Sequence, residues 1–217
     1  MWVPLEVEGR WHSASALDPQ AAIVPTDTDI VPGRPGRPRS VETERAVLEG
    51  AYQLMATKGL AATTIDAISR EAGVSKMTIY KWWPSREALL IDAFLRKAAS
   101  LLPLSEEGDP VALLRAHAAA YAEALDGEFG KVQLAVIAEC IARTGSGRLF
   151  SERYLDVRRS LGIRIIRNGQ RAGQIDSGRP AEELYDQIYG TLFYQSTFGL
   201  RPLSPAYVWR LVDAVLT

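Results

Sequence analysis

The sequence has one cysteine, Cys140, and two histidines, so several kinds of chemistry have few residues to use. A single cysteine cannot form an internal disulfide, and in an apolar helical segment it is better explained as a small buried hydrophobe than as a redox sensor. Metal sites need several His, Cys or carboxylate ligands at set spacing, and no such set occurs. No histidine lies in register with Cys140 for nucleophilic catalysis, and no glycine-rich phosphate loop is present. We therefore expect a protein that is not an enzyme and that has no cofactor and no metal.

Long hydrophobic runs are also missing. No stretch approaches the ~18 consecutive apolar residues that a membrane helix needs. The N-terminus, MWVPLEVEGR, has no basic segment followed by an apolar core, so it does not look like a secretory signal. We expect no membrane partner and a cytoplasmic location.

Net charge is small, at −1, but it is unevenly distributed. Residues 1–32 carry 1 Lys/Arg against 5 Asp/Glu, whereas residues 33–100 carry 11 against 7. The middle segment is therefore locally basic, which is typical of a module that binds phosphates.

The hydrophobic pattern is helical throughout and no strand pattern competes with it, so the predicted fold class is all-α. The expected organisation is a disordered tail over 1–39 that ends in a basic arm, a helix-turn-helix DNA-binding domain over 40–84, and a helical ligand-binding and dimerisation domain over 85–217, whose first helix, 85–101, connects the two. Helices are predicted at 41–58, 65–71, 76–82, 85–101, from 110, and at 129–142, 149–171, 181–197 and 206–216. Thr63 with Asp66 has capping-box spacing at the second helix, and Ser75 and Ser85 are N-cap candidates for the next two.

Three short helices with a tight turn at Ala72-Gly73-Val74 form a helix-turn-helix, whose third helix reads the major groove of DNA. The stretch from Thr63 to Leu89, TTIDAISREAGVSKMTIYKWWPSREAL, resembles the N-terminal pattern of the tetracycline-repressor (TetR) family of bacterial regulators. The resemblance covers about residues 41–95 and is highly specific. Beyond it the likeness is only architectural.

The resemblance implies a homodimer on a palindromic operator in double-stranded DNA, usually acting as a repressor that a small-molecule effector releases. It places Thr64 and Ser75 near phosphates, Lys76, Met77 and Lys81 over base edges, and Tyr80, Trp82 and Arg86 against the DNA backbone. Thr78 belongs to the same candidate set. Asp66 is a departure, because relatives often carry a basic or long polar residue there, and an aspartate cannot bind guanine.

Two adjacent tryptophans divide between core and surface. Trp83 falls with Ile79 on the buried face of its helix, whereas Trp82 falls on the side of Tyr80 and Ser75. We expect Trp83 in the core and Trp82 at the surface.

The basic run before the first helix has two readings that the sequence leaves open. Arg37 and Arg39 resemble the Arg-Pro core of an AT-hook, which lies in the minor groove. A solvated linker explains the same residues.

The helix at 129–142 is apolar around most of its circumference, so other helices must surround it. A cavity beside it would take a mostly apolar ligand, with a few tyrosine hydroxyls, His117 and Gln133 as polar groups. The candidate ligand-binding residues are His117, Tyr121, Phe129, Gln133, Val136, Phe150, Tyr189 and Phe193. For His117, a satisfied core histidine is the plainer explanation.

The last two helices carry apolar positions that predict pairing across a two-fold axis. These positions are Leu184, Ile188, Leu192, Phe193, Val208, Leu211, Val212 and Val215. The alternative function is a DNA-binding regulator or architectural protein without a ligand, and a filled C-terminal core would favour it. Operator sequence, effector identity and repression versus activation are not encoded in any pattern here.

Overall fold

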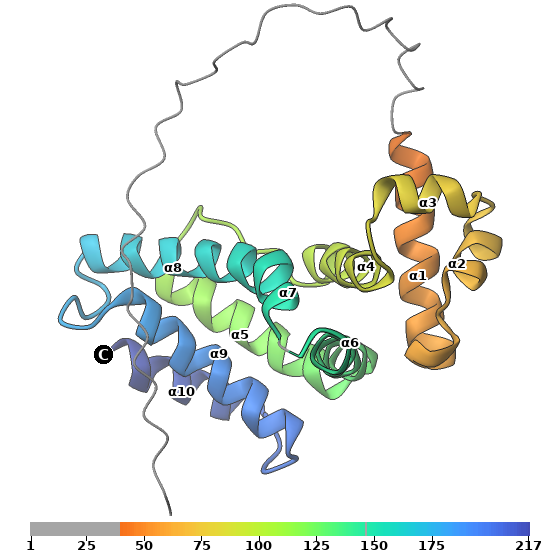
Figure 1. Ribbon diagram of the computed structural model, residues 1–217. Helices are drawn as coiled ribbons and strands as arrows, with labels where there is room; N and C mark the ends of the chain where they lie inside the picture. The colour runs from red at the N-terminus through yellow and green to blue at the C-terminus, as the bar shows by residue number, and fades with distance from the viewer. Residues whose placement is uncertain (1–39, 146) are drawn as a thin grey trace, which may run out of the picture. The chain divides into compact units, whose positions relative to one another are not determined.

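The computed structural model describes residues 40–145 and 147–217, and this part of the chain is helical with no strand (Figure 1). The predicted all-α fold class is thereby confirmed. The elements are α1 (Val41–Ala62), α2 (Ile65–Ala72), α3 (Lys76–Trp82), α4 (Arg86–Leu101), α5 (Pro110–Asp126), α6 (Glu128–Thr144), α7 (Arg148–Phe150), the π-helix η1 (Ser151–Leu155), α8 (Asp156–Arg171), α9 (Ala181–Thr197) and α10 (Pro205–Leu216). None of the described helices is long and apolar enough to cross a membrane.

Helix starts follow the side-chain caps that the sequence offers. Ser75 accepts from the Thr78 amide at α3, and Ser85 accepts from the Ala88 amide at α4. At α2 the expected cap is displaced by one residue. Thr64, not Thr63, accepts from the Ala67 amide, while the Thr63 hydroxyl donates back to the Gly59 carbonyl.

Two glycines set the turns of the helix-turn-helix. Gly59 has φ of 76° and ψ of 168°, which breaks the helical path of α1 near the predicted end and lets the chain continue to Ala62. Gly73 follows α2 in the left-handed conformation, with φ of 64°. A side chain is disfavoured in that conformation, so glycine lets α3 cross α2 directly after the turn.

The segment predicted as one helix over 149–171 has three parts. A short α7 leads into η1, and α8 begins at Asp156. The π turn widens the helix for one turn and changes which side chains face inward. Such turns occur often at functional sites.

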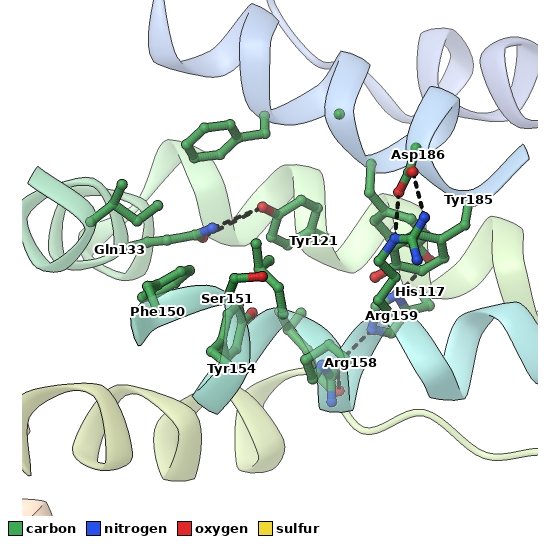
Figure 2. A pocket seen from close by; sticks show the side chains of 16 residues that line it. His117, Tyr121, Gln133, Phe150, Ser151, Tyr154, Arg158, Arg159, Tyr185 and Asp186 are labelled. Atoms are coloured by element: carbon green, nitrogen blue, oxygen red, sulfur yellow. Dashed lines mark hydrogen bonds and ion pairs between the residues drawn. The ribbon is translucent and has the colours of Figure 1, made fainter. Parts of the chain in front are cut away.

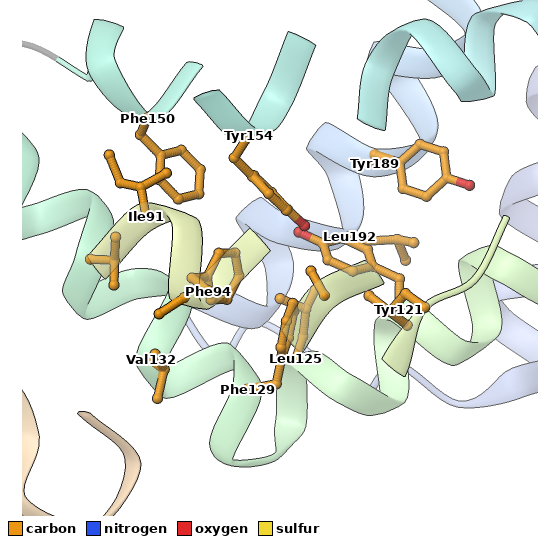
Figure 3. Close-up of a cluster of buried hydrophobic side chains, with 14 of the residues drawn as sticks. Ile91, Phe94, Tyr121, Leu125, Phe129, Val132, Phe150, Tyr154, Tyr189 and Leu192 are labelled. Carbon is orange, nitrogen blue, oxygen red and sulfur yellow. The ribbon is translucent and has the colours of Figure 1, made fainter. Parts of the chain in front are cut away.

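The core of the C-terminal part is aromatic (Figure 3). Phe94 of α4 is fully buried and stacks on Phe129 of α6 at a centroid distance of 4.7 Å. Phe150 and Tyr154 lie at 5.9 and 5.0 Å in the same chain of ring contacts. Because α4 also packs against α1, this cluster joins the helix-turn-helix to α6 and η1. Cys140 is buried as well, as expected for a small hydrophobe.

Candidate functional site

The recognition helix α3 presents polar and apolar side chains to solvent from a buried base. Ile79 is fully buried beneath it, whereas Met77 is 83% exposed and Tyr80 is 57% exposed. Lys81 and Thr64 are exposed as well. An 83% exposed methionine is unusual unless it meets a partner, and a thymine methyl is a partner of the right chemistry.

Two predicted readers in this region have partners within the protein. Lys76 forms an ion pair of 2.7 Å with Asp66 of α2, and both side chains are more than half exposed. Such a pair contributes little stability and can open when phosphates approach. The Ser75 and Thr78 hydroxyls share a hydrogen bond of 2.9 Å, so the cap and its neighbour are held together.

The two tryptophans separate by one residue in burial. Trp83 is 2% exposed, as expected for core, and its indole donates to Asp92 Oδ2 at 2.9 Å. Trp82 is half-buried and packs edge-on against Trp83. Trp82 therefore lies at the boundary, with part of its ring accessible.

Arg86 differs from the expected role against the DNA backbone. Its Nε donates to the Thr63 carbonyl at 2.9 Å, its Nη2 donates to the Leu60 carbonyl at 2.5 Å, and its Nη1 donates to Glu139 Oε1 at 2.6 Å. Since all three guanidinium nitrogens are bonded inside the protein, no fork is presented to a phosphate. Arg86 instead ties the end of α1 to α6. Arg37 and Arg39 lie outside the described residues.

A cavity of about 420 Å³ lies among α5, α6, η1, α8 and α9 (Figure 2). This volume is within the range of pockets that hold a small molecule. Its lining residues are Leu102, His117, Tyr121, Gln133, Ile137, Phe150, Ser151, Tyr154, Leu155, Arg158, Arg159, Tyr185, Asp186, Tyr189, Gly190 and Phe193. The described C-terminal part is therefore not a filled core.

The structure brings together most of the candidate ligand residues but not all of them. His117, Tyr121, Gln133, Phe150, Tyr189 and Phe193 line the cavity. Phe129 and Val136 do not, and their assignment is corrected. Phe129 stacks on Phe94, and Val136 is 1% exposed in the core, so both face the inner side of α6 and α4.

A buried hydrogen-bonded row crosses the cavity wall. His117 lies between the Tyr189 hydroxyl, at 2.7 Å from Nδ1, and Arg158 Nη2, at 2.7 Å from Nε2. Arginine only donates, so Nε2 accepts and the neutral ring carries its proton on Nδ1, which donates to Tyr189. The Tyr189 hydroxyl proton is then left to donate elsewhere. On the opposite side, Gln133 Nε2 donates to the Tyr121 hydroxyl at 3.1 Å.

This environment predicts a pH dependence of stability. Burial, and then the Arg158 guanidinium, lowers the pKa of His117 from 6.5 to about 4. The unfolded chain takes up the proton at higher pH than the folded chain, so stability falls as pH drops from about 6.5 towards 4. Between about pH 7.5 and about pH 5, urea denaturation is expected to show a loss about 2 kcal/mol larger in the natural protein than in His117→Gln. Identical pH profiles for the two proteins would contradict the neutral, buried histidine.

The mouth of the cavity carries an ion pair. Arg159 donates to both oxygens of Asp186, at 2.8 and 2.6 Å. Leu155, which is 42% exposed, lies in the same rim. The charges at the rim are thus matched with each other.

The residues expected to pair across a two-fold axis are used inside the protomer. Leu184, Ile188, Leu192, Val208 and Val212 are fully buried. The apolar side chains that α9, α10 and their connection expose are different ones, namely Tyr194, Phe198, Leu200 and Trp209, each at least 51% exposed.

Sequence reasoning missed Arg158 altogether. It was assigned to an exposed basic face of a regular helix with Arg153, Arg159, Arg164 and Arg167, yet it is 7% exposed. Tyr154, Tyr185 and Ser151 were missed as lining residues for the same reason, because the π turn changes the phase of the helix. The spacing of Tyr154 and Arg158, one turn apart, was the available signal.

Comparisons with known proteins agree with this architecture. The family profile described as "Bacterial regulatory proteins, tetR family" matches residues 47–93, and the profile described as "Tetracyclin repressor-like, C-terminal domain" matches residues 104–215. The uncharacterized HTH-type transcriptional regulator YdeS of Bacillus subtilis (strain 168) is 34% identical over 184 residues, covering 82% of this chain and 89% of that protein.

Solved structures show the same likeness. The TetR family transcription regulator SCO0332 has a TM-score of 0.70 at 28% identity, over 81% of this chain and 97% of that chain. The flavonoid-responsive regulator FrrA has a TM-score of 0.57 at 25% identity, over 82% and 94%. With both halves matched by family profiles and a relative at 34% identity along most of its length, the chain belongs to the TetR family of bacterial transcriptional regulators.

Proposed function

We propose that this TetR-family regulator is a homodimeric repressor that binds a palindromic operator through α2 and α3 and is released by a small molecule in the cavity. The observation that carries the proposal is the pairing of two features in one chain. An exposed recognition face and a cavity of about 420 Å³ are joined by α4, which packs against both α1 and η1. A regulator without a ligand gives no reason to keep such a space open.

The proposed DNA-contacting surface keeps the residues of the sequence prediction except Arg86. Its members are Thr64, Ser75, Lys76, Met77, Thr78, Tyr80, Lys81 and Trp82. Their side chains are exposed or half-exposed on α3 and at the start of α2. A tyrosine hydroxyl and a threonine hydroxyl suit phosphates, and lysines suit guanine acceptors.

The proposed dimer face is the exposed apolar set on and between α9 and α10. Tyr194, Phe198, Leu200 and Trp209 lie where a second copy can cover them. Monomers rarely leave that many large apolar side chains in one region. Pairing there would place two recognition helices about one DNA turn apart, ~34–36 Å in simple helix-turn-helix dimers.

Small-molecule response is supported by the cavity and by likeness. FrrA, which shares this fold, is named for its response to flavonoids. Release requires the ligand to prefer a conformation in which the recognition helices no longer match successive major grooves. The same requirement means that operator DNA weakens ligand binding by the same factor.

The function is tested by selecting DNA with the purified full-length chain and then measuring variants on the selected operator. Lys76→Ala and Lys81→Ala are expected to reduce the preference for operator over random DNA by about 1–3 kcal/mol each, if a bidentate base contact is lost. Arg164→Ala, on the exposed face of α8, is the matched control for removal of a positive charge. Equal losses on operator and random DNA for both lysine variants would refute base reading. A monomer by sedimentation that still binds operator fully would refute the dimer.

A further inference from the structure

One charged group in the cavity wall has no opposite charge. Arg158 is 7% exposed, and its only hydrogen bonds among the described residues run from Nη2, to the Leu102 carbonyl at 2.5 Å and to His117 Nε2 at 2.7 Å. No Asp or Glu of 40–145 or 147–217 lies within ion-pair distance of it. Arg153, Arg159 and Arg164 differ, because each is paired with a carboxylate.

Burying a guanidinium without a counter-charge is costly, since neither a carbonyl nor a neutral imidazole cancels the charge. Both partners of Arg158 use the same nitrogen, so Nε and Nη1 make no hydrogen bond to another described residue. Since Arg158 lines the cavity, these donors are available to a group inside it. A carboxylate can accept from an arginine in two parallel bonds.

We propose that the effector is an amphiphile with a single anionic head, most simply a carboxylate, that binds Arg158 while its apolar body fills the aromatic part of the cavity. This inference rests on the proposed small-molecule response and deepens it. The Tyr189 hydroxyl lies next to the same site, and because it accepts from His117 it has its own proton to donate to the second oxygen of the head.

The remaining lining favours one negative charge and no positive one. The only carboxylate in the lining, that of Asp186, is already bonded by Arg159 at the rim (Figure 2). With His117 neutral, two guanidinium groups face one carboxylate, so the lining has a net charge of +1. The rest of the wall is aromatic, with Tyr121, Phe150, Tyr154, Tyr185 and Phe193, and it suits an alkyl or ring body.

The test uses matched probes that share one body and differ in the head. Decanoate, decanol and decylamine form one series, and 1-naphthoate with its alcohol and amine forms a second. Calorimetric titration of the full-length protein is expected to show binding of the carboxylate about tenfold or more tighter than the alcohol in at least one series, and no binding of the amine. Tightest binding of an alcohol or amine would overturn the proposal, and so would the absence of carboxylate binding in both series.

Arg158 variants test the head contact. Arg158→Gln and Arg158→Met are expected to weaken carboxylate binding about tenfold to a hundredfold and to leave alcohol binding unchanged. Arg164→Gln removes a positive charge from an exposed position on the same helix and is expected to change neither. Equal losses for carboxylate and alcohol would show a general disruption of the cavity and would count against the proposal.

A second readout needs no probe. If Arg158 is held for a ligand, the empty protein carries an uncompensated buried charge, and Arg158→Met is expected to raise the melting temperature. A lowered melting temperature, or failure to fold, would make Arg158 a structural group and overturn the assignment.

Operator binding measured on the same samples separates the two proposals. Release of operator by a neutral probe, with none by the carboxylates, would retain small-molecule regulation and reject the anionic head. Loss of operator binding in the absence of any probe would instead count against the proposed function.

Discussion

Arg86→Ala is expected to lower the free energy of unfolding by about 2–4 kcal/mol, because it breaks a partly buried ion pair and removes the donors of two carbonyls. The guanidinium bonds Thr63, Leu60 and Glu139, and its side chain is 17% exposed. Its hydrogen bond is also the main cause that holds the pKa of Glu139 below its ordinary value. Urea denaturation of the purified variant measures the loss.

The salt dependence of DNA binding distinguishes this role from a phosphate contact. A lost phosphate contact lowers the log–log slope against salt by about one per protomer, as expected for Lys81→Ala. Arg86→Ala is expected to leave that slope unchanged while reducing stability. Arg86→Lys should recover little of the loss, since an ammonium cannot bond two carbonyls and a carboxylate in the planar arrangement of a guanidinium. A stable Arg86→Ala protein with a reduced slope would restore the DNA-backbone role.

The sequence predicted well what is decided by near neighbours along the chain. Ser75 and Ser85 cap the helices that follow them, and Gly73 adopts the left-handed conformation of the turn. The bounds of α3 agree with the expected 76–82 because cap, helix and the following Pro84 lie within a few residues of one another. Helical periodicity also separated Trp83, in the core, from Trp82 at its edge.

What failed depends on partners that are distant in sequence. Arg86 bonds a carbonyl 23 residues away and a carboxylate 53 residues away, and no local pattern announces either. Phe129 and Val136 are apolar positions of α6 as expected, but periodicity does not tell which face of a surrounded helix meets a cavity and which meets α4. Arg158 was placed on a solvated face because a regular helix was assumed where η1 inserts a π turn.

The inner wall of the cavity and the recognition helix are connected through a single carboxylate. Asp92 of α4 accepts from the indole of Trp83, the residue that ends α3, at 2.9 Å. The same carboxylate accepts from Arg153 of η1 at 2.8 and 3.0 Å. Tyr154, next to Arg153, lines the cavity. A ligand that shifts η1 therefore moves a group bonded to the end of the recognition helix.

Asp92→Asn is expected to reduce the effect of ligand on operator affinity from a family-typical ~5- to 150-fold towards no effect. An asparagine oxygen can still accept from Trp83, but it gives no charge to hold Arg153, so η1 can move without α3. Operator titrations with and without the tightest-binding probe measure the ratio, and titration of probe with and without operator must give the same ratio. Ligand affinity in the absence of DNA is expected to stay within about twofold, because Asp92 is not part of the cavity lining.

Glu106→Gln is the matched control for that experiment. It removes a carboxylate that pairs with an arginine of α8, as Asp92 pairs with Arg153, but its ion pair with Arg164 does not reach the helix-turn-helix. The coupling ratio of this variant is expected to equal that of the natural protein. If Asp92→Asn keeps the full ratio while the protein remains folded, the signal does not pass through Trp83, Asp92 and Arg153. The remaining contact between the cavity helices and the helix-turn-helix would then be the Glu139–Arg86 pair on α6, whose neighbours Gln133 and Ile137 line the cavity.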